Sequence, residues 1–260
     1  MVHSSLVRNV ALIIWCTSIF LEVLVLFRGI IARVTAKYPF FYAFVVGTLV
    51  VNSLLLYAYV RANNFYYTFY WYGEFLTLVL ACGIILEIFR HVLSPYPGAA
   101  RLARIIAIIT FGVILCSSGV YPLLARLGSV SSTVEDLERD LRCVQAIFLL
   151  SILTLISYYR IPIGRNMKGM ITGYGISIGV NLMTLVIYSY TQGRYATILS
   201  TVGQLGYTVP NVIWAAALWS YAPNPENKAA RIEEDYEELA RRTQATMDTL
   251  RGYLGKAVRP

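Results

Sequence analysis

The chain has 260 residues, of which 57% are hydrophobic and only 14% are charged. Soluble domains carry about 25% charged residues, so this composition excludes an ordinary soluble globular domain and indicates a membrane protein. The formal net charge is +8. No basic soluble face is evident that could bind nucleic acid, and we expect the excess bases to lie at loop ends beside the headgroups of the lipid bilayer.

Seven apolar segments follow one another along the chain, each close to the roughly 17–25 residues that cross a bilayer as a helix. They are residues 6–31, 40–60, 66–90, 105–125, 143–159, 169–190 and 196–221. The first contains Glu22 and ends in Phe27 and Arg28 rather than in a small-residue cleavage site, so we expect a retained anchor. The sequence therefore predicts an all-α fold, with a seven-transmembrane helical bundle over residues 1–221.

Lysine and arginine are unevenly distributed over the connections between these segments. One set of connections, together with the tail, holds 16 basic residues, and the other set holds 6. Basic residues favour the cytoplasmic side. We therefore expect a multi-pass protein of the cell membrane (inner or plasma membrane) with its N-terminus outside. Residues 222–260 would then form a charged amphipathic helix in the cytoplasm.

The outer connection before the fifth segment holds three arginines, Arg142 among them, together with four acidic residues. Ser132 and Glu135 have the spacing of a capping box, in which each side chain accepts a hydrogen bond from a main-chain amide at a helix start. We expect a short amphipathic helix here that continues into the fifth segment.

Polar side chains inside the apolar segments are functional candidates, because an ionisable group in the hydrocarbon region costs roughly 2.5–3.5 kcal/mol. The residues that could line one outward-opening ligand cavity are Glu74, Asn181, Gln204 and Tyr207. The residues of a deeper intramembrane polar layer are Glu22, Asn52 and Asn211. Hydrogen bonding between helices, without any ligand, is the alternative interpretation.

Glu87 stands near the inner end of the third segment, with Arg90 and His91 three and four residues further on. That spacing places the three side chains on one helix face. We expect a local ion pair at the membrane interface.

Two small-residue motifs occur in the sixth segment, Gly169-x-x-x-Gly173 and Gly175-x-x-x-Gly179. Such motifs let two helix backbones approach closely, either within one chain or across a homo-oligomer. In the seventh segment Pro210 removes a main-chain hydrogen bond, so it is either a hinge or a structural kink.

The tail repeats apolar residues at intervals of three and four over residues 225–257, with acidic and basic clusters on the remaining face. This pattern fits a solvated helix that packs on the membrane domain. It also fits a helix that binds a cytoplasmic or membrane protein partner.

Several cofactors and reactions lack the residues that they need. The four lysines, Lys37, Lys168, Lys228 and Lys256, lie outside the apolar segments, which excludes a retinal Schiff base. The two histidines, His3 and His91, lie at opposite surfaces, which excludes a two-histidine haem. The four cysteines form no C-x-x-C pair, and no hydrolase, zinc-protease or P-loop motif is present. We expect no cofactor or metal, and an enzyme is the least favoured class.

Three short stretches are similar to a group of uncharacterised bacterial seven-helix membrane proteins of acidobacterial type. They are Tyr70-Trp71-Tyr72-Gly73-Glu74, Glu87-Ile-Phe-Arg90-His91-Val92 and the pair Pro95-Tyr96. The resemblance implies a prokaryotic inner membrane and supplies no function.

The function best supported by these features is a sensory or signalling module. A small ligand would bind within the bundle, the last segment would shift at Pro210, and the tail would report to a partner. One alternative is a small-solute or proton-coupled carrier that uses Glu22 and Glu74. Another is an accessory or scaffold subunit of a membrane complex.

Overall fold

The computed structural model describes residues 2–61, 66–94, 97–120, 130–191 and 196–222, together with residues 225, 241, 243, 244 and 247. Within these residues every regular element is helical. The helices are α1 (Val2–Ile31), α2 (Pro39–Val60), α3 (Tyr66–Val92), α4 (Pro97–Ile114), the π-helix η1 (Leu115–Val120), α6 (Val130–Tyr159), α7 (Arg165–Thr191) and α8 (Ala196–Ala217).

The chain separates into two units, Met1–Asn224 and Pro225–Pro260. In the second unit Arg241, Thr243, Gln244 and Met247 are helical. The rest of the predicted tail helix lies outside the described residues, as do the side chains of Ser132 and Glu135.

Six of the helices are long and apolar enough to cross a membrane, so the chain is a multi-pass helical membrane protein. The apolar stretches are Asn9–Ile31, Pro39–Val60, Phe69–Val92, Ala100–Ser118, Asp136–Tyr159 and Arg165–Tyr188. α8 has the length of a span but contains Gln204, Pro210 and Asn211, and it is not among the six. The seventh span and the outward orientation of the N-terminus stay predictions.

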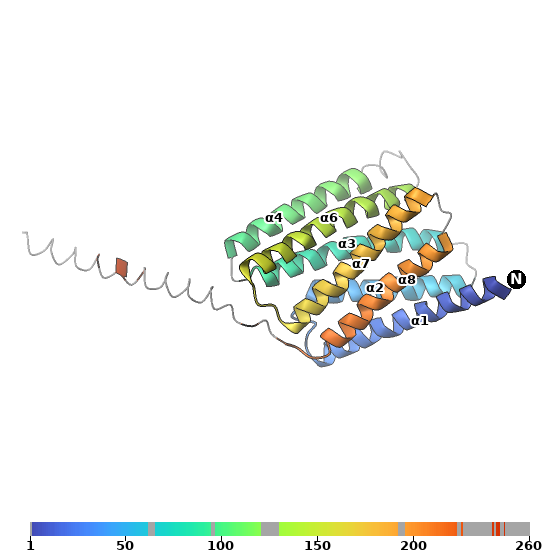
Figure 1. The fold of residues 1–260 in the computed structure, drawn as a ribbon, viewed down its shortest axis with the longest axis horizontal. Helices are drawn as coiled ribbons and strands as arrows, with labels where there is room; N and C mark the ends of the chain where they lie inside the picture. Colours follow the sequence, from blue (N-terminus) through green and yellow to red (C-terminus); the bar gives the residue numbers. More distant parts are fainter. Residues whose placement is uncertain are drawn as a thin grey trace, which may run out of the picture. The chain divides into compact units, whose positions relative to one another are not determined.

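The helices form a closed ring in which α1, α2, α3, α6, α7 and α8 each pack against the next, and α8 returns to α1 (Figure 1). α4 stands outside this ring against α3 and α6. α6 is a single helix of 30 residues. It therefore includes both the expected amphipathic segment and the fifth apolar segment.

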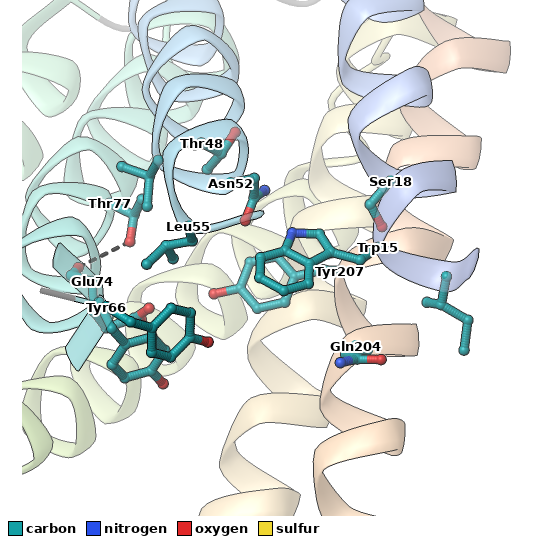
Figure 2. Close-up of a pocket in the computed structure, with 13 residues that line it drawn as sticks. Trp15, Ser18, Thr48, Asn52, Leu55, Tyr66, Glu74, Thr77, Gln204 and Tyr207 are labelled. Atoms are coloured by element: carbon teal, nitrogen blue, oxygen red, sulfur yellow. Dashed lines mark hydrogen bonds between the residues drawn. The ribbon is translucent and has the colours of Figure 1, made fainter. Parts of the chain in front are cut away.

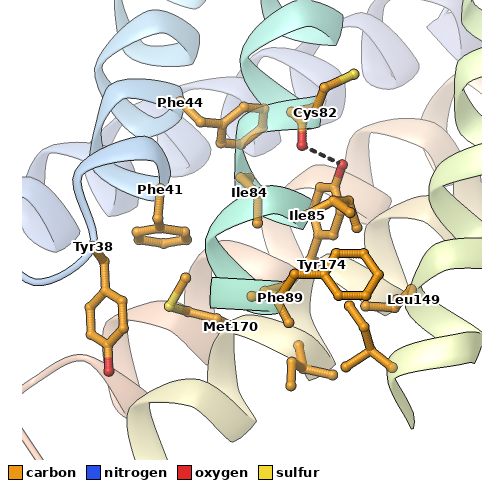
Figure 3. Packing of buried hydrophobic residues seen from close by; sticks show 14 of the residues in the cluster. Tyr38, Phe41, Phe44, Cys82, Ile84, Ile85, Phe89, Leu149, Met170 and Tyr174 are labelled. Atoms are coloured by element: carbon orange, nitrogen blue, oxygen red, sulfur yellow. Dashed lines mark hydrogen bonds between the residues drawn. The ribbon is translucent and has the colours of Figure 1, made fainter. Parts of the chain in front are cut away.

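Aromatic side chains and close helix contacts fill the middle of the ring (Figure 3). Phe41 of α2 meets Trp214 of α8 edge to face, with ring centroids 5.1 Å apart. Tyr174 of α7 donates a hydrogen bond to the main-chain oxygen of Ala81 in α3, at 3.0 Å. These contacts join helices that are not neighbours in the ring.

The first glycine motif of α7 faces α8 within the same chain. A Cβ atom on Gly169 would collide with the Cβ of Ala217, and one on Gly173 would collide with the indole nitrogen of Trp214. The second motif is different, because Gly175 lies against Leu149 of α6 and Gly179 faces open space. The close helix approach predicted from these motifs therefore belongs to the first glycine pair.

We expected Glu87 to form a local ion pair with Arg90 and His91, and in the structure Arg90 acts on it as a nearby charge while the carboxylate itself binds main-chain amides. The Glu87 carboxylate accepts hydrogen bonds from the main-chain amides of Phe40 and Phe41, at 3.2 and 2.7 Å. The side chain of Tyr38, at the N-cap of α2, makes no capping hydrogen bond. Glu87 therefore supplies from α3 the acceptor that these helix-start amides need.

His91 also differs from the expected ion pair. Its ring nitrogen Nδ1 lies 3.0 Å from the main-chain oxygen of Glu87, and the ring packs on Tyr38 with centroids 4.9 Å apart.

Candidate functional site

A pocket of about 220 Å³ lies among α1, α2, α3 and α8 (Figure 2). Four aromatic side chains line it, those of Trp15, Tyr66, Tyr70 and Tyr207, and so does the carboxylate of Glu74. Trp15 and Tyr207 extend from α1 and α8 toward the other two helices. At roughly 30 Å³ per water molecule, the pocket has room for about seven waters or a small molecule of similar bulk.

The pocket brings together three of the four residues predicted for a ligand cavity, namely Glu74, Gln204 and Tyr207. Asn181 is not one of its lining residues. It lies on α7, and its side-chain amide donates a hydrogen bond to the main-chain oxygen of Ser177, at 2.7 Å. Asn52, predicted for the deeper layer, also lines the pocket.

Glu74 belongs to a buried charged cluster that also contains Arg142 and Glu138 of α6. The Arg142 guanidinium lies 3.6 Å from Glu74 Oε1 and 3.5 Å from Glu138 Oε1, and it donates a hydrogen bond to the Tyr207 hydroxyl at 3.3 Å. The Arg142 side chain is 5% exposed and both glutamate side chains are 16% exposed. One guanidinium thus faces two carboxylates, which leaves one negative charge in excess when both are ionised.

The contacts of this cluster are long for charge-assisted hydrogen bonds, which are usually about 2.7–2.9 Å. Glu74 Oε1 is buried and has no hydrogen-bond partner. The guanidinium therefore attracts the Glu74 carboxylate without satisfying this oxygen.

A second carboxylate lies deeper, at Glu22 of α1, which is 2% exposed. The Asn52 amide donates a hydrogen bond to Glu22 Oε1 at 3.0 Å, while Oε2 is buried without a hydrogen-bond partner. The side chains of Thr48 and Asn211 also approach this carboxylate. The structure thus brings together the three residues of the deeper polar layer, next to the pocket wall that Asn52 forms.

The serine and threonine hydroxyl groups on the pocket wall already donate their hydrogens within the protein. Thr48 and Thr77 donate to main-chain oxygens within their own helices, at 3.0 and 2.9 Å. Thr208 donates to the main-chain oxygen of Gln204 at 3.0 Å, so Ser18, 2.6 Å from the Thr208 oxygen, must be the donor of that pair. A hydroxyl has one hydrogen and two lone pairs. The hydroxyls of Ser18, Thr48 and Thr77 therefore offer only lone pairs to a ligand.

Sequence reasoning missed Arg142 and Gln145 as interior residues. Gln145 is fully buried, and its amide lies 3.5 Å from the Cys82 sulfur. Gln145 stands four residues from both Leu141 and Leu149, which are buried. Arg142 stands three residues before Gln145, so the helical period of this apolar stripe was the available signal.

Neither a metal site in the described residues nor similarity to a known protein indicates what this pocket does. In the described part of the chain, no group of three or more His, Cys, Asp or Glu side chains could hold a metal ion. Comparison with protein-family models, with curated proteins and with solved structures finds no match.

Proposed function

We propose that this chain is a sensory or signalling protein of the cell membrane that binds a small ligand in the pocket among α1, α2, α3 and α8. The observation that carries the proposal is the position of α8. This helix supplies Gln204 and Tyr207 to the pocket and then leads to the end of the first unit. A ligand that binds one position of α8 better than another would shift the helix between the two.

The chain of contacts after the pocket supports transmission along α8. Pro210 stands three residues after Tyr207 inside the continuous helix, where it leaves the main-chain oxygen of Gly206 without its helical partner. Beyond the helix, the Asn166 side chain of α7 binds the main chain on both sides of Tyr221. It donates to Ser220 O at 3.0 Å and accepts from Ala222 N at 2.7 Å. These hydrogen bonds hold the residues that precede the tail to α7, so a movement of α8 reaches the tail only by breaking them or by carrying the start of α7 with it.

In this proposal α8 is the seventh span, the N-terminus and the pocket opening face outward, and residues 225–257 meet a partner in the cytoplasm. The packing of α8 against both α1 and α7 supports the seventh span. The excess of basic residues on one set of connections supports the orientation.

The test uses the full chain, extracted gently with host lipids, and native mass spectrometry to find a bound small molecule. A spin label at Met247→Cys, with the four native cysteines replaced by alanine, follows the tail. We expect a bound molecule, and a change in label mobility when the molecule is added back to stripped protein. Glu74→Gln should abolish both. Asp136→Asn removes a carboxylate from the exposed face of α6 and should change neither.

Glu22 supports a second candidate, a small-solute or proton-coupled carrier, because its buried carboxylate lies next to the pocket and deeper in the bundle. Uptake of the bound molecule into proteoliposomes, with a tail that does not respond, would favour the carrier over the sensory proposal. An unresponsive tail without uptake would contradict both.

A further inference from the structure

The chemistry of the pocket wall indicates which class of ligand it fits. We propose that the pocket binds a small organic cation, an ammonium compound of about seven non-hydrogen atoms. This inference rests on the pocket being the ligand site proposed above, and adds the charge and the kind of group that the ligand carries.

The first support is the balance of charge around the pocket. Glu74 lines it, Glu138 lies behind it, and Glu22 lies next to Asn52 on the deeper side. Arg142 is the one base in this group, and it is held between Glu74 and Glu138. With Glu74 and Glu138 ionised, the cluster beside the pocket carries one negative charge in excess, and Glu22 adds a second only when it too is ionised. A cation is therefore attracted, and an anion would lie near carboxylates with no free base among the described residues that line the pocket.

The second support is the supply of acceptor atoms. The hydroxyls of Ser18 and Thr48 offer only lone pairs, as shown above. Ammonium N–H groups, or the polarised C–H groups of a methylated ammonium, would satisfy these acceptors. Donors also face this space from the tyrosine hydroxyls and the Trp15 indole, so a ligand hydroxyl would be accommodated as well.

The third support is the set of aromatic rings. Trp15, Tyr66, Tyr70 and Tyr207 surround the space from three helices. The negative face of an aromatic ring attracts a cation, and rings around a pocket are a means of recognising ammonium groups.

Choline and its neutral isostere 3,3-dimethylbutan-1-ol separate the charge of the ligand from its shape. Calorimetric titration of the stripped full chain in lipid nanodiscs should show choline and tetramethylammonium binding, and the neutral isostere binding at least tenfold more weakly. Glu74→Gln should weaken choline binding at least tenfold. Trp15→Leu should weaken it about fivefold to thirtyfold, and Trp15→Phe less, because Phe keeps an aromatic face.

Two matched controls show whether a loss is specific to the pocket. Asp136→Asn removes an exposed carboxylate of α6, and Phe20→Leu removes an aromatic ring that is 65% exposed on the outer face of α1. Both should leave choline binding unchanged. Thermal unfolding and size-exclusion profiles of each variant identify those that fail to fold, and Trp15→Leu tests the site independently of Glu74.

The outcomes distinguish this inference from the function proposed above. Equal binding of choline and the neutral isostere, both lost in Gln204→Leu, would overturn the cation and leave the ligand pocket standing. Failure of both cations to bind, with a neutral or anionic molecule found in the native protein, would do the same. Binding of choline that survives both Glu74→Gln and Trp15→Leu would overturn the cation site in this pocket.

Discussion

The sequence and the folded chain place the Arg142 side chain in different surroundings. As one of three arginines before an apolar segment, it counts as an outer loop base. In the structure it is buried between Glu74 and Glu138. Its removal from the count leaves the unequal distribution of bases intact, so the predicted orientation does not depend on it.

Replacement of Arg142 by glutamine should destabilise the bundle, because two buried carboxylates would lose their only counter-charge. We expect a loss of about 3 kcal/mol in the free energy of unfolding. Adding Glu138→Gln should recover part of it, since one of the unpaired charges is then removed. Arg139→Gln, on a side chain that is 60% exposed, should cost less than about 0.5 kcal/mol. Reversible denaturant unfolding in mixed micelles measures all four proteins.

Glu87 offers a sharper test, because its two possible roles predict different partners. If it caps α2, Glu87→Gln should lower the free energy of unfolding by about 1 kcal/mol. Arg90→Gln should then have little effect, because Arg90 is exposed and the carboxylate binds amides instead. Equal losses in the two variants, measured in the same micelles, would restore the ion pair that the sequence suggested.

At the scale of helices, the contact between α7 and α8 depends on the absence of side chains. Gly169 and Gly173 let the helix backbones approach, whereas Gly179 on the same helix faces open space. The sequence shows the glycines but not which of them meets a neighbour, because spacing alone does not identify the helix that packs against a motif.

Alanine at the three glycines should therefore have opposite effects. Gly169→Ala and Gly173→Ala should each cost about 1–3 kcal/mol through overpacking against α8. Gly179→Ala should be neutral or stabilise by up to about 1 kcal/mol, since alanine favours a helix more than glycine does. Thermal unfolding ranks the variants, and light scattering reports oligomer mass. A change of mass in Gly169→Ala at unchanged monomer stability would instead assign this pair to an interface between chains.

At the scale of the whole molecule, the helices could be predicted from apolar length, but the ring order could not. A helix of a soluble protein reveals its buried face by a polar opposite face. In a membrane both faces are apolar, so Phe20, which is exposed, and Phe41, which is buried, look alike in the sequence. The same difficulty affects the site. The sequence identifies Glu74, Gln204 and Tyr207 because they are polar residues in apolar segments, and all three line the pocket. Asn181 is polar too, but it lies on α7, binds the main chain of its own helix and does not line the pocket.

The closed ring predicts a cross-link between its first and last helices. Ser18 and Thr208 touch through their hydroxyls at 2.6 Å, so cysteines at both positions should form a disulfide on mild oxidation, with the four native cysteines replaced by alanine. A protease site inserted between η1 and α6 would cut the chain in two. On a denaturing gel the two halves should migrate as one covalent species until the disulfide is reduced. Phe20→Cys with Thr208→Cys is the control and should come apart, because Phe20 points away from the bundle.

Because the first and last helices close the ring, the ring cannot be completed until the last helix has been synthesised. Glu22 and Asn52 are made early, and α8 follows only after about 150 further residues, roughly 8–30 s later at 5–20 residues per second. During that interval the Glu22 carboxylate has Asn52 but not Asn211 beside it. Until α8 is made, the face of α1 that carries Glu22 therefore lacks the helix that packs against it in the folded ring. A chain that stops before α8 would present an open, charged groove to the quality-control proteases of the membrane.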